Sequence, residues 1–324
     1  MKILITGGTG TLGHEIVKQL WAKPTSVDAQ TIDGCDWSAV DRIVIYSRGE
    51  QRQVEMSKEY PEYPKNVIRY DIGDIRDRDR LAQAMRGCDT VIHAAALKHV
   101  PVCEYNPQEA ISTNVLGAKN VIEACNIAGV KKCIVVSTDK AVEPITLYGA
   151  TKFAMEKMAI AANNLGSCRF SVVRYANVYG SNGSVIPIWR KQHAEGLPLT
   201  ITDSKMTRMW ITIEEAARFI LSRFDLIQGG EVFVPRCHSE NIVQTALKCL
   251  PVVEGHEHKV DFVETGIRPS EKLHETLISE SDARDCWKMA DRSYICFPPI
   301  HDWIACYKYP LVKMPETFRM CSNV

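Results

Sequence analysis

Short apolar runs alternate with segments of helical pattern from Ile3 to Arg174. The runs are Ile3–Thr6, Ile43–Tyr46, Val67–Tyr70, Thr90–His93, Cys133–Val136 and Ser171–Arg174. Strands that are joined through helices pair in parallel with right-handed crossovers, and helices on both faces of the sheet bury such apolar strands. The alternation therefore predicts an α/β fold built on a doubly wound parallel sheet.

The alternation changes after Arg174, and loop residues become more frequent from Gly180 onward. A helical pattern over Glu214–Asp225 and a further strand over Glu231–Val234 are expected to return to the sheet. From Asp282 to the end the pattern indicates only helices and loops. We expect a Rossmann nucleotide-binding domain made of residues 1–180 and 210–236, and a smaller, discontinuous C-terminal substrate lobe made of residues 181–209 and 237–324.

Composition restricts the class of partner. The 324 residues contain 39 basic and 39 acidic side chains, so no overall field favours nucleic acid or an anionic membrane. Every apolar run is interrupted before the roughly 18 residues that a membrane span needs. The twelve cysteines form no Cys-x-x-Cys pair, which argues against a zinc site and suits free thiols. We expect a cytoplasmic protein with a small-molecule substrate and no metal.

The segment Thr6–Gly13 (TGGTGTLG) follows the first predicted strand and opens a helix that runs to Trp21. Glycines at such a turn let the backbone approach a pyrophosphate, which lies at the positive helix N-terminus. The alternative is a plain glycine-rich turn, but the strand-turn-helix context favours a dinucleotide site. The residues expected to contact the cofactor here are Gly7, Thr9, Gly10, Thr11, Leu12 and Gly13.

The second predicted strand ends in Ser47 and Arg48, where an NAD enzyme usually carries an acidic residue against the ribose hydroxyls. A guanidinium suits the 2′-phosphate of NADP instead, because it can bind phosphate through two nitrogens. We therefore expect NADP, with Ser47 and Arg52 assisting Arg48. The alternative is that Arg48 is a solvated loop charge.

Tyr148 and Lys152 are four residues apart and would project from one face of a helix that follows the fifth strand. In that arrangement the lysine can hold the nicotinamide ribose and lower the pKa of the tyrosine. The phenolate would then remove a hydroxyl proton while hydride leaves the same carbon. Tyr-x-x-x-Lys is common by itself, and its place after the strand ending in Ser137 and Thr138 gives it weight.

With these residues the sequence resembles the extended short-chain dehydrogenases, and among them the UDP-N-acetylglucosamine 4,6-dehydratases of surface-polysaccharide and flagellin-sugar pathways. The resemblance covers residues 1 to about 278. Its further motifs are Ser137–Val142, Leu147–Lys152, Tyr46–Arg48, Gly73–Asp77, His93–Pro101, Glu104–Pro107, Gly183–Pro187, Met206–Arg208, Trp210–Thr212 and Gly266–Pro269 with Glu271 and Lys272.

A dehydratase needs two groups that a 4-epimerase does not. One removes the proton on carbon 5, and the other protonates the departing hydroxyl on carbon 6. Asp139 and Lys140 follow Thr138 directly, and we assign Asp139 as the acid and Lys140 as the base. The reverse assignment stays open, and so does the alternative that this pair is a solvated turn. Lysine acts as a base only when its pKa is lowered.

The resemblance also implies contacts for the cofactor and for UDP. Further cofactor residues would be Asp74, Ile75, Ala94, Ala95, Ala96, Asn114, Ser137, Tyr175, Asn177 and Val178, besides Tyr148 and Lys152. Substrate residues would be Lys98, Thr138, Asn177, Val185, Thr200, Ile201, Met206, Arg208, Arg268 and Glu271. Relatives assemble as dimers to hexamers, so a homo-oligomer is expected.

The resemblance implies conversion of UDP-N-acetylglucosamine to a UDP-2-acetamido-2,6-dideoxy-4-keto-L-hexose. Large membrane-anchored relatives that retain the carbon 5 configuration commonly carry methionine at the position of Tyr148, so tyrosine indicates the branch that inverts carbon 5. Three alternatives remain open from the sequence. They are a retaining 4,6-dehydratase, a 4-epimerase of UDP-N-acetylhexosamines, and a scaffold that senses NADP without catalysis.

Overall fold

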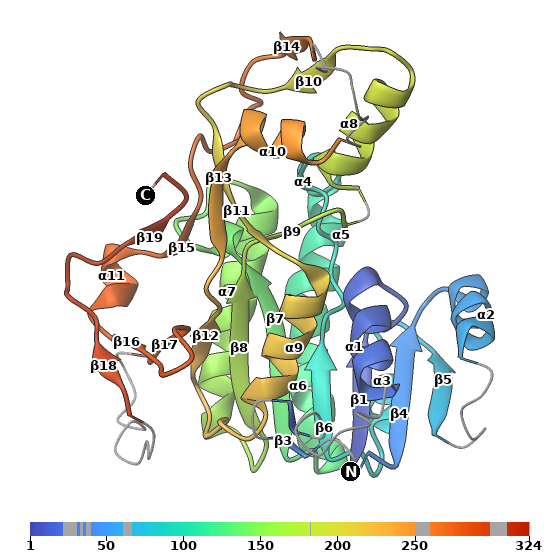
Figure 1. Ribbon diagram of the computed structural model, residues 1–324. Coiled ribbons are helices and arrows are strands. Elements are labelled where there is room, and N and C mark those ends of the chain that lie inside the picture. The colour runs from blue at the N-terminus through green and yellow to red at the C-terminus, as the bar shows by residue number, and fades with distance from the viewer. Residues whose placement is uncertain are drawn as a thin grey trace.

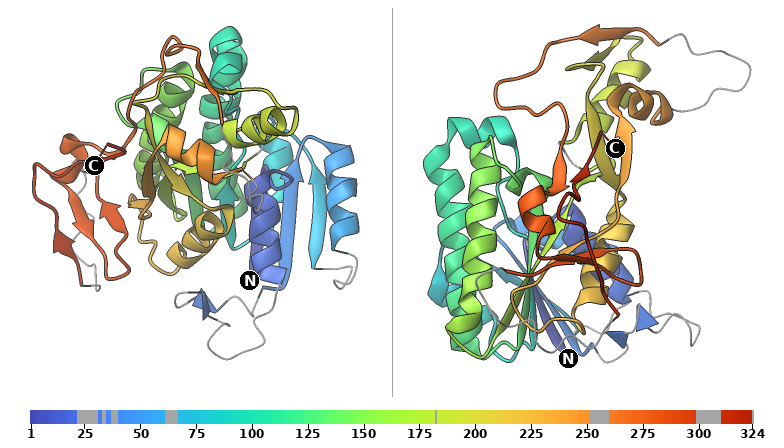
Figure 2. Two further views of the ribbon diagram at one scale, coloured as in Figure 1. Left: turned by 45° about the horizontal axis from the view of Figure 1, so that its top comes forward. Right: turned by 90° about the vertical axis from the view of Figure 1, so that its left-hand side faces the viewer.

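In the computed structural model, helices cover both faces of one large sheet, and a smaller lobe lies over one edge of this unit (Figures 1 and 2). The structure describes residues 1–21, 31–32, 35–36, 40–60, 67–181, 183–250, 260–298 and 310–323.

Seven strands of this sheet are parallel. In spatial order they are β5 (Ile68–Ile72), β4 (Arg42–Ser47), β1 (Lys2–Thr6), β6 (Thr90–His93), β7 (Lys132–Thr138), β8 (Arg169–Tyr175) and β12 (Val232–Val234). The centres of all but β5 are apolar and buried, as strands covered on both faces must be, whereas β5 at the edge has Asp71 as its buried residue. The doubly wound α/β fold expected from the alternation is confirmed, and every predicted strand exists within two residues of its expected bounds.

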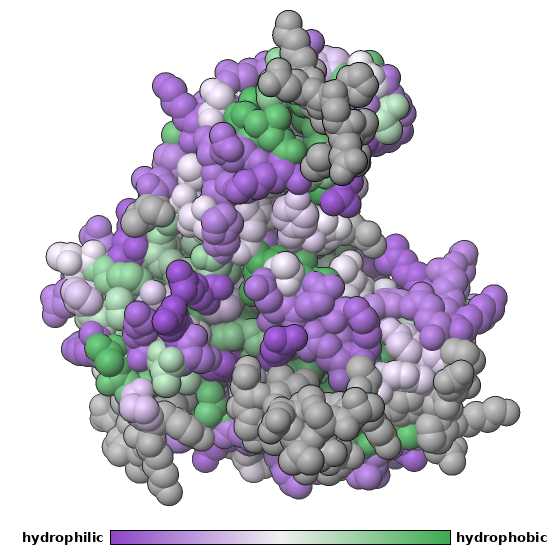
Figure 3. All heavy atoms as spheres, viewed as in Figure 1, coloured by the Kyte–Doolittle hydropathy of each residue, from purple (hydrophilic) through white to green (hydrophobic). Residues whose placement is uncertain are grey.

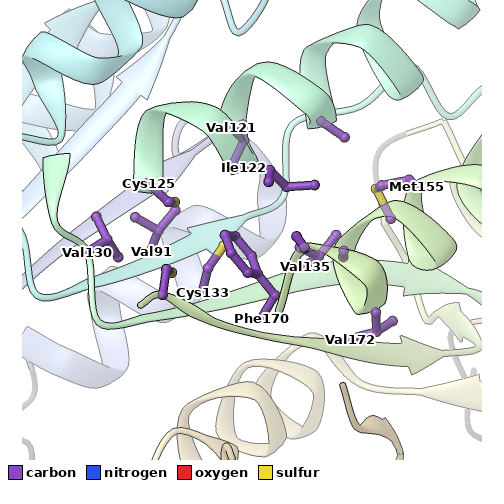
Figure 4. Close-up of a cluster of buried hydrophobic side chains, with 14 of the residues drawn as sticks. Val91, Val121, Ile122, Cys125, Val130, Cys133, Val135, Met155, Phe170 and Val172 are labelled. Atoms are coloured by element: carbon purple, nitrogen blue, oxygen red, sulfur yellow. The ribbon is translucent and has the colours of Figure 1, made fainter. Parts of the chain in front are cut away.

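One face of the sheet is covered by α3 (Arg78–Ala84), α6 (Gly117–Ala128) and α7 (Leu147–Ala161). Phe170, Val135 and Val91 from the strands pack against Val121 and Met155 from these helices, as Figure 4 shows. Short helical segments complete this layer: α4 (Val100–Tyr105), α5 (Pro107–Ile111), a π-helical turn (Ser112–Leu116), and the 3-10 turns Asp139–Ala141 and Ala162–Asn164.

The opposite face is covered by α1 (Thr11–Trp21), α2 (Glu50–Glu59) and α9 (Ile213–Arg223). Helix α9 begins with a reciprocal capping box between Thr212 and Glu215, which satisfies backbone donors at its N-terminus. Its buried face packs beside α1, so the segment predicted to return to the sheet does so. A two-stranded ribbon, β2 (Thr31–Ile32) and β3 (Cys35–Asp36), lies outside this layer.

Three antiparallel strands extend the sheet beyond β12. They are β17 (Tyr294–Cys296), β16 (Cys286–Lys288) and β18 (Val312–Lys313). We expected only helices and loops after Asp282 and placed this stretch in the second lobe, and that expectation was wrong. Strands of two or three residues have too few positions for alternation to show. The edge of β12 offers them unpaired backbone groups to pair with.

The smaller lobe has its own core, which includes Trp189, Leu199 and Ile242. Its elements are α8 (Val185–Ala194), β10 (Leu199–Ile201), β14 (Phe262–Glu264) and α10 (Ile242–Lys248). A three-stranded sheet of β9 (Asn177–Val178), β11 (Thr207–Ile211) and β13 (His238–Asn241) lies beneath it. Farther along the chain, β15 (Thr276–Ile278) pairs with β19 (Met320–Cys321), and α11 (Glu280–Ala283) follows β15.

Of the residues assigned to this lobe, 182, 251–259, 299–309 and 324 lie outside the described ranges. Among the described residues, no helix is both long enough and apolar enough to span a bilayer.

A buried arginine ties the sheet to the C-terminal segment. Arg174, on β8, donates to both carboxylate oxygens of Glu156 at 3.1 and 2.7 Å. It also donates to the carbonyl of Leu277 at 2.9 Å and to Asp282 at 3.0 Å. Arg174 and Glu156 are both fully enclosed, so each charge depends on the other for compensation.

Glu156→Ala should lower the free energy of unfolding by about 3–5 kcal/mol, because it leaves the Arg174 guanidinium buried without its main partner. Urea unfolding followed by circular dichroism measures the change. Glu195→Ala is the control, since Glu195 forms an exposed ion pair with Lys191 at 3.8 Å and should cost no more than about 0.5 kcal/mol. Equal losses in the two variants would contradict the assignment.

Candidate active site

A cavity of about 1780 Å³ opens where the parallel strands end at their carboxyl edge. Its walls come from both the sheet unit and the smaller lobe. Figure 3 shows the molecule notched between the lobe with α8 and α10 and the part with α1 and α2. Ligands of doubly wound folds bind outside the carboxyl ends of the strands, so the position is that of a ligand site.

The cavity brings together nearly all the residues that the sequence singled out. Those at its wall are Gly7, Thr9, Gly10, Thr11, Leu12, Ser47, Arg48, Arg52, Asp74, Ile75, Ala94, Ala95, Ala96, Lys98, Ser137, Thr138, Lys140, Tyr148, Lys152, Tyr175, Asn177, Val178, Val185, Thr200, Ile201, Met206, Arg208, Arg268 and Glu271. The exceptions are Gly13, Asn114 and Asp139.

The glycine turn has the steric form that a dinucleotide requires. Gly7 has φ +68°, and a Cβ there would lie 2.9 Å from the backbone of Ala95. A Cβ on Gly13 would lie 2.1 Å from the carbonyl oxygen of Gly8, so this glycine sets the approach of α1 to the turn without facing the cavity. The turn therefore fits a pyrophosphate at the N-terminus of α1.

At the end of β4, Arg48 and Arg52 line the cavity with exposed side chains. The Arg48 guanidinium lies 3.7 Å from the carboxylate of Asp74. Burial opposes ionisation of Asp74, but hydrogen bonds from Arg76 outweigh it and lower the pKa of this carboxyl. Gln53 donates to both the carbonyl and the hydroxyl of Ser47, which fixes the strand end. The two arginines suit an anionic group on the adenosine side.

Asn114 lies behind the wall of the cavity, not in it. Its side-chain oxygen accepts from the Leu97 amide at 2.8 Å, and its nitrogen donates to the Leu97 carbonyl and to Thr151. These bonds hold the chain that follows β6 against α7. The sequence predicts a cofactor contact for Asn114. In the structure its side chain instead holds the loop that follows β6.

Tyr148 and Lys152 project from α7, which begins at Thr146 with a hydrogen bond from Gly149 to its side chain. Lys152 donates to the carbonyl of Val136 at 2.6 Å. Burial lowers the pKa of Lys152 to about 8, although Glu156 opposes this. Burial and the charge of Asp139 raise the pKa of Tyr148, and a hydrogen bond with Thr138 lowers it. The expected lowering of the Tyr148 pKa is therefore not achieved by these protein groups alone.

Asp139 and Lys140 form a 3-10 turn that Thr138 begins. The Asp139 carboxylate accepts from the Thr138 hydroxyl at 2.7 Å and from the Lys140 ammonium at 3.1 Å. Lys140 lines the cavity and also donates to Asn177 at 3.1 Å, whereas Asp139 is buried and does not line it. Burial would lower the pKa of Lys140, but Asp139 and Glu275 outweigh it and raise that pKa. A base role requires that the ammonium first lose a proton.

Two groups at the cavity wall were missed by the sequence reasoning. Glu275 is buried, and its carboxylate lies 3.7 Å from the Lys140 ammonium. Lys272 donates to the carbonyl of Val142 at 2.7 Å. Lys272 was part of the quoted motif that ends the resemblance, and Glu275 lies three residues beyond it.

In the smaller lobe, Arg208 is buried and already engaged. It donates to the carbonyls of Thr207 and Leu273 at 2.8 and 3.1 Å and lies 3.4 Å from Glu271. Arg268 is exposed and pairs with the same glutamate at 3.6 Å. Two guanidiniums on one wall suit a diphosphate, with Glu271 orienting both.

Residues 3–296 match the family model described as polysaccharide biosynthesis protein. The chain belongs to this family. Over 287 residues it is 49% identical to a protein of Campylobacter jejuni named UDP-N-acetylglucosamine 4,6-dehydratase (inverting), covering 87% of this chain and 78% of that protein. The family resemblance drawn from the motifs is thus confirmed.

Two further similarities bear on fold and substrate class. A Rickettsia canadensis protein named UDP-glucose 4-epimerase is 37% identical over 292 residues, covering 89% of this chain and 81% of that protein. The X-ray structure of Pen from Bacillus thuringiensis is 30% identical with a TM-score of 0.83, and the match covers 99% of this chain and 92% of that one. The fold therefore extends over the whole chain in a solved relative.

Lys152→Met should stabilise the protein in the absence of ligand, because a buried ammonium with a lowered pKa opposes folding. Between pH 8 and the ordinary lysine range, the unfolded chain binds the proton that the folded chain has lost. Stability therefore rises with pH for the wild type relative to the variant, and at pH 7 the variant gains on the order of 3 kcal/mol. Urea unfolding as a function of pH measures both.

The matched control is Lys157→Met, an exposed position on the same helix, which should change stability by no more than about 0.5 kcal/mol. A Lys152→Met protein that is less stable than the wild type at pH 7 would contradict the lowered pKa.

Proposed function

We propose that this protein is a UDP-N-acetylglucosamine 4,6-dehydratase that inverts carbon 5. The observation that carries the proposal is the placement of Lys140 beside Tyr148 and Lys152 at one cavity wall, with the buried Asp139 carboxylate in contact with the Lys140 ammonium at 3.1 Å. An epimerase needs only Tyr148 and Lys152. The 49% identity to a relative named for the inverting dehydration supports this choice over the 37% identity to one named as an epimerase.

The proposed cofactor is NADP, held by the turn Gly7–Gly13 and by Arg48. Two observations support it: the turn leaves no room for a Cβ at Gly7, and two exposed arginines, Arg48 and Arg52, line the cavity at the end of β4, where a 2′-phosphate would need a positive charge. When bound, it supplies a hydride acceptor for carbon 4 and returns the hydride at carbon 6. Lys152, which already faces the cavity, would hold the nicotinamide ribose.

In the first step Tyr148 takes the proton of the carbon 4 hydroxyl. The protein raises the pKa of Tyr148 through burial and the charge of Asp139. A positive charge close to the phenolate would oppose both effects, and Lys152, one helical turn away, is the cation proposed for this task. Thr138 donates to Asp139 and hydrogen-bonds Tyr148, so one hydroxyl links the two pairs.

In the second step, a single proton transfer between Lys140 and Asp139 produces both the acid and the base. One proton passes from the Lys140 ammonium to the Asp139 carboxylate, across the 3.1 Å contact that joins them. The amine then removes the carbon 5 proton, which the carbon 4 ketone has made acidic, and Asp139 protonates the carbon 6 hydroxyl as it leaves. Because Asp139 is buried and does not line the cavity, this delivery requires a movement that brings its carboxyl group to the substrate.

The function is tested by NMR of the products of UDP-N-acetylglucosamine in heavy water. The wild type should give a 4-keto-6-deoxy sugar with inverted carbon 5 that carries deuterium. UDP-N-acetylgalactosamine as the only product would establish a 4-epimerase, retained configuration would establish the retaining dehydratase, and no product at all would favour a scaffold.

Tyr148→Phe should lower turnover by about 10²–10⁴-fold, because no other group is placed to take the carbon 4 proton. Product formation is followed in the same NMR assay. Tyr294→Phe, which removes a hydroxyl on β17 outside the cavity, should leave turnover unchanged. A fully active Tyr148→Phe protein would overturn the mechanism for any substrate.

Arg48→Ala should weaken NADP binding by about 10–100-fold, because it removes a charge-assisted contact of about 1.5–3 kcal/mol to the 2′-phosphate. NAD binding should change little, so the ratio of the two dissociation constants is the readout, measured by isothermal titration calorimetry. Arg78→Ala, an exposed arginine outside the cavity, is the control. An equal loss for both cofactors would argue against the phosphate contact.

A further inference from the structure

Lys140 lies between two carboxyl groups, not one. Its ammonium nitrogen is 3.1 Å from Asp139 Oδ1 on one side and 3.7 Å from Glu275 Oε1 on the other. Asp139 belongs to the same turn, whereas Glu275 comes from the far C-terminal part of the chain, just before β15. Both carboxyl groups are buried, so water does not solvate the charge of either one.

The two carboxyl groups differ in the donors that surround them. Asp139 accepts from the Thr138 hydroxyl, the Lys140 amide and the Lys140 ammonium, which stabilise it as a carboxylate. Glu275 Oε2 is buried with no hydrogen-bond partner, and Oε1 has only the longer contact to Lys140. A buried carboxyl group without donors favours its uncharged form, because protonation removes the cost of an unsolvated charge.

The position of Glu275 is fixed by the end of the described chain. Its amide donates to the Ser322 hydroxyl at 2.9 Å, and the Ser322 amide donates back to the Glu275 carbonyl at 2.9 Å. The Ser322 hydroxyl also contacts Thr207 Oγ1 at 2.7 Å, next to Arg208. Pairing of β15 with β19 continues this attachment. A clamped backbone holds the Glu275 side chain against Lys140, away from other donors.

We propose that Glu275 is a positioning residue that carries a proton during the reaction, and that its uncharged form allows Lys140 to act as the base. The inference rests on the proposed dehydration. With Glu275 as a carboxylate, the three groups sum to one negative charge and Lys140 is held as an ammonium between two anions. With Glu275 protonated, the sum is zero. A proton transfer from Lys140 to Asp139 then converts an ion pair into a neutral amine and a neutral acid.

The proton transfer then balances within the site. An N–H bond of the Lys140 ammonium breaks and an O–H bond forms on Asp139, which leaves an amine and two carboxylic acids with no change in proton number. The amine takes the carbon 5 proton, the electron pair of that C–H bond forms the new double bond, and the carbon 6 hydroxyl leaves as water with the Asp139 proton. Glu275 keeps its proton throughout.

The surrounding charges agree with this assignment. The charged groups that act on Glu275 are Lys140 and Asp139 from the turn after β7, Arg208 from β11 and Lys272 from its own segment. Burial raises the pKa of Glu275, and Asp139 adds to this effect, while Lys140, Arg208 and Lys272 oppose it without reversing it. The net direction therefore favours a proton on Glu275 at pH values where exposed glutamates have ionised.

The first test compares Glu275→Gln with the wild type in the rate of deuterium appearance at carbon 5 across a pH series. For the wild type, the rate should fall about tenfold per pH unit above the pKa of Glu275, as the proton is lost. Glutamine is uncharged at every pH, so the carbon 5 exchange rate of the variant should show no such fall. Glu280→Gln, an exposed glutamate five residues further on, is the charge-matched control and should behave as the wild type.

A Glu275→Gln protein with an unchanged fall at high pH would overturn the proposal. So would one that has lost carbon 5 exchange at every pH while it still binds NADP, because the carboxylate itself would then be required. A wild type that yields no deuterated 4-keto sugar would instead overturn the proposed function.

The second test needs no turnover. In the infrared spectrum of the wild type in heavy water, the carbonyl band of a buried carboxylic acid should persist at neutral pH and disappear on titration with base. Its absence from the Glu275→Gln spectrum assigns the band. A wild type without such a band at neutral pH would refute the protonated Glu275 whatever the substrate of the enzyme is.

Discussion

The parallel pairing of β1, β6, β7 and β8 is the constraint on which the site depends. Parallel strands in register end at one edge, so the residues that follow them meet there although they are far apart in sequence. The pairing of Thr6 with His93, and of Thr138 with Tyr175, puts the glycine turn, the Asp139–Lys140 turn and the lobe entrance side by side. A slip of one residue would turn a strand over, so that side chains packed against the helices of one face would point toward the helices of the other.

The same edge accumulates charge that the fold does not fully satisfy. Lys152, Asp139 and Glu275 are buried, and Lys140 is mostly so. Compare Arg174, whose guanidinium meets two carboxylates and a carbonyl within 3.1 Å. That cluster is saturated with partners and stabilises the fold, whereas the one at the cavity has an oxygen of Glu275 and the hydroxyl of Ser137 without partners. Polar groups without partners at a cavity wall can bind a ligand. They lower the free energy of unfolding, and such groups are typical of functional sites.

Most of the fold and of the cavity wall could be predicted, because strand patterns and strand-end motifs are local in sequence. Gly7, Arg48, Thr138 and Tyr148 each lie within a few residues of a predictable strand or helix end. Glu275 could not be found in this way, since it meets Lys140 only through the pairing of β15 with β19. Asn114 failed for a related reason, because an amide beside a site can serve the loop or the ligand, and only the contacts to Leu97 decide.

The C-terminal segment is therefore part of the site and not an appendage to it. Between Arg268 and Asp282, one stretch of chain supplies Glu271 to the arginines of the smaller lobe, Glu275 to Lys140, and two of the partners of Arg174. Because these contacts reach both walls of the cavity and the core of the sheet, a shift of this stretch would alter diphosphate contacts and the charge beside Lys140 together. In the proposed mechanism, substrate binding and proton transfer would be coupled through this one backbone segment, which Ser322 holds from the far end of the described chain.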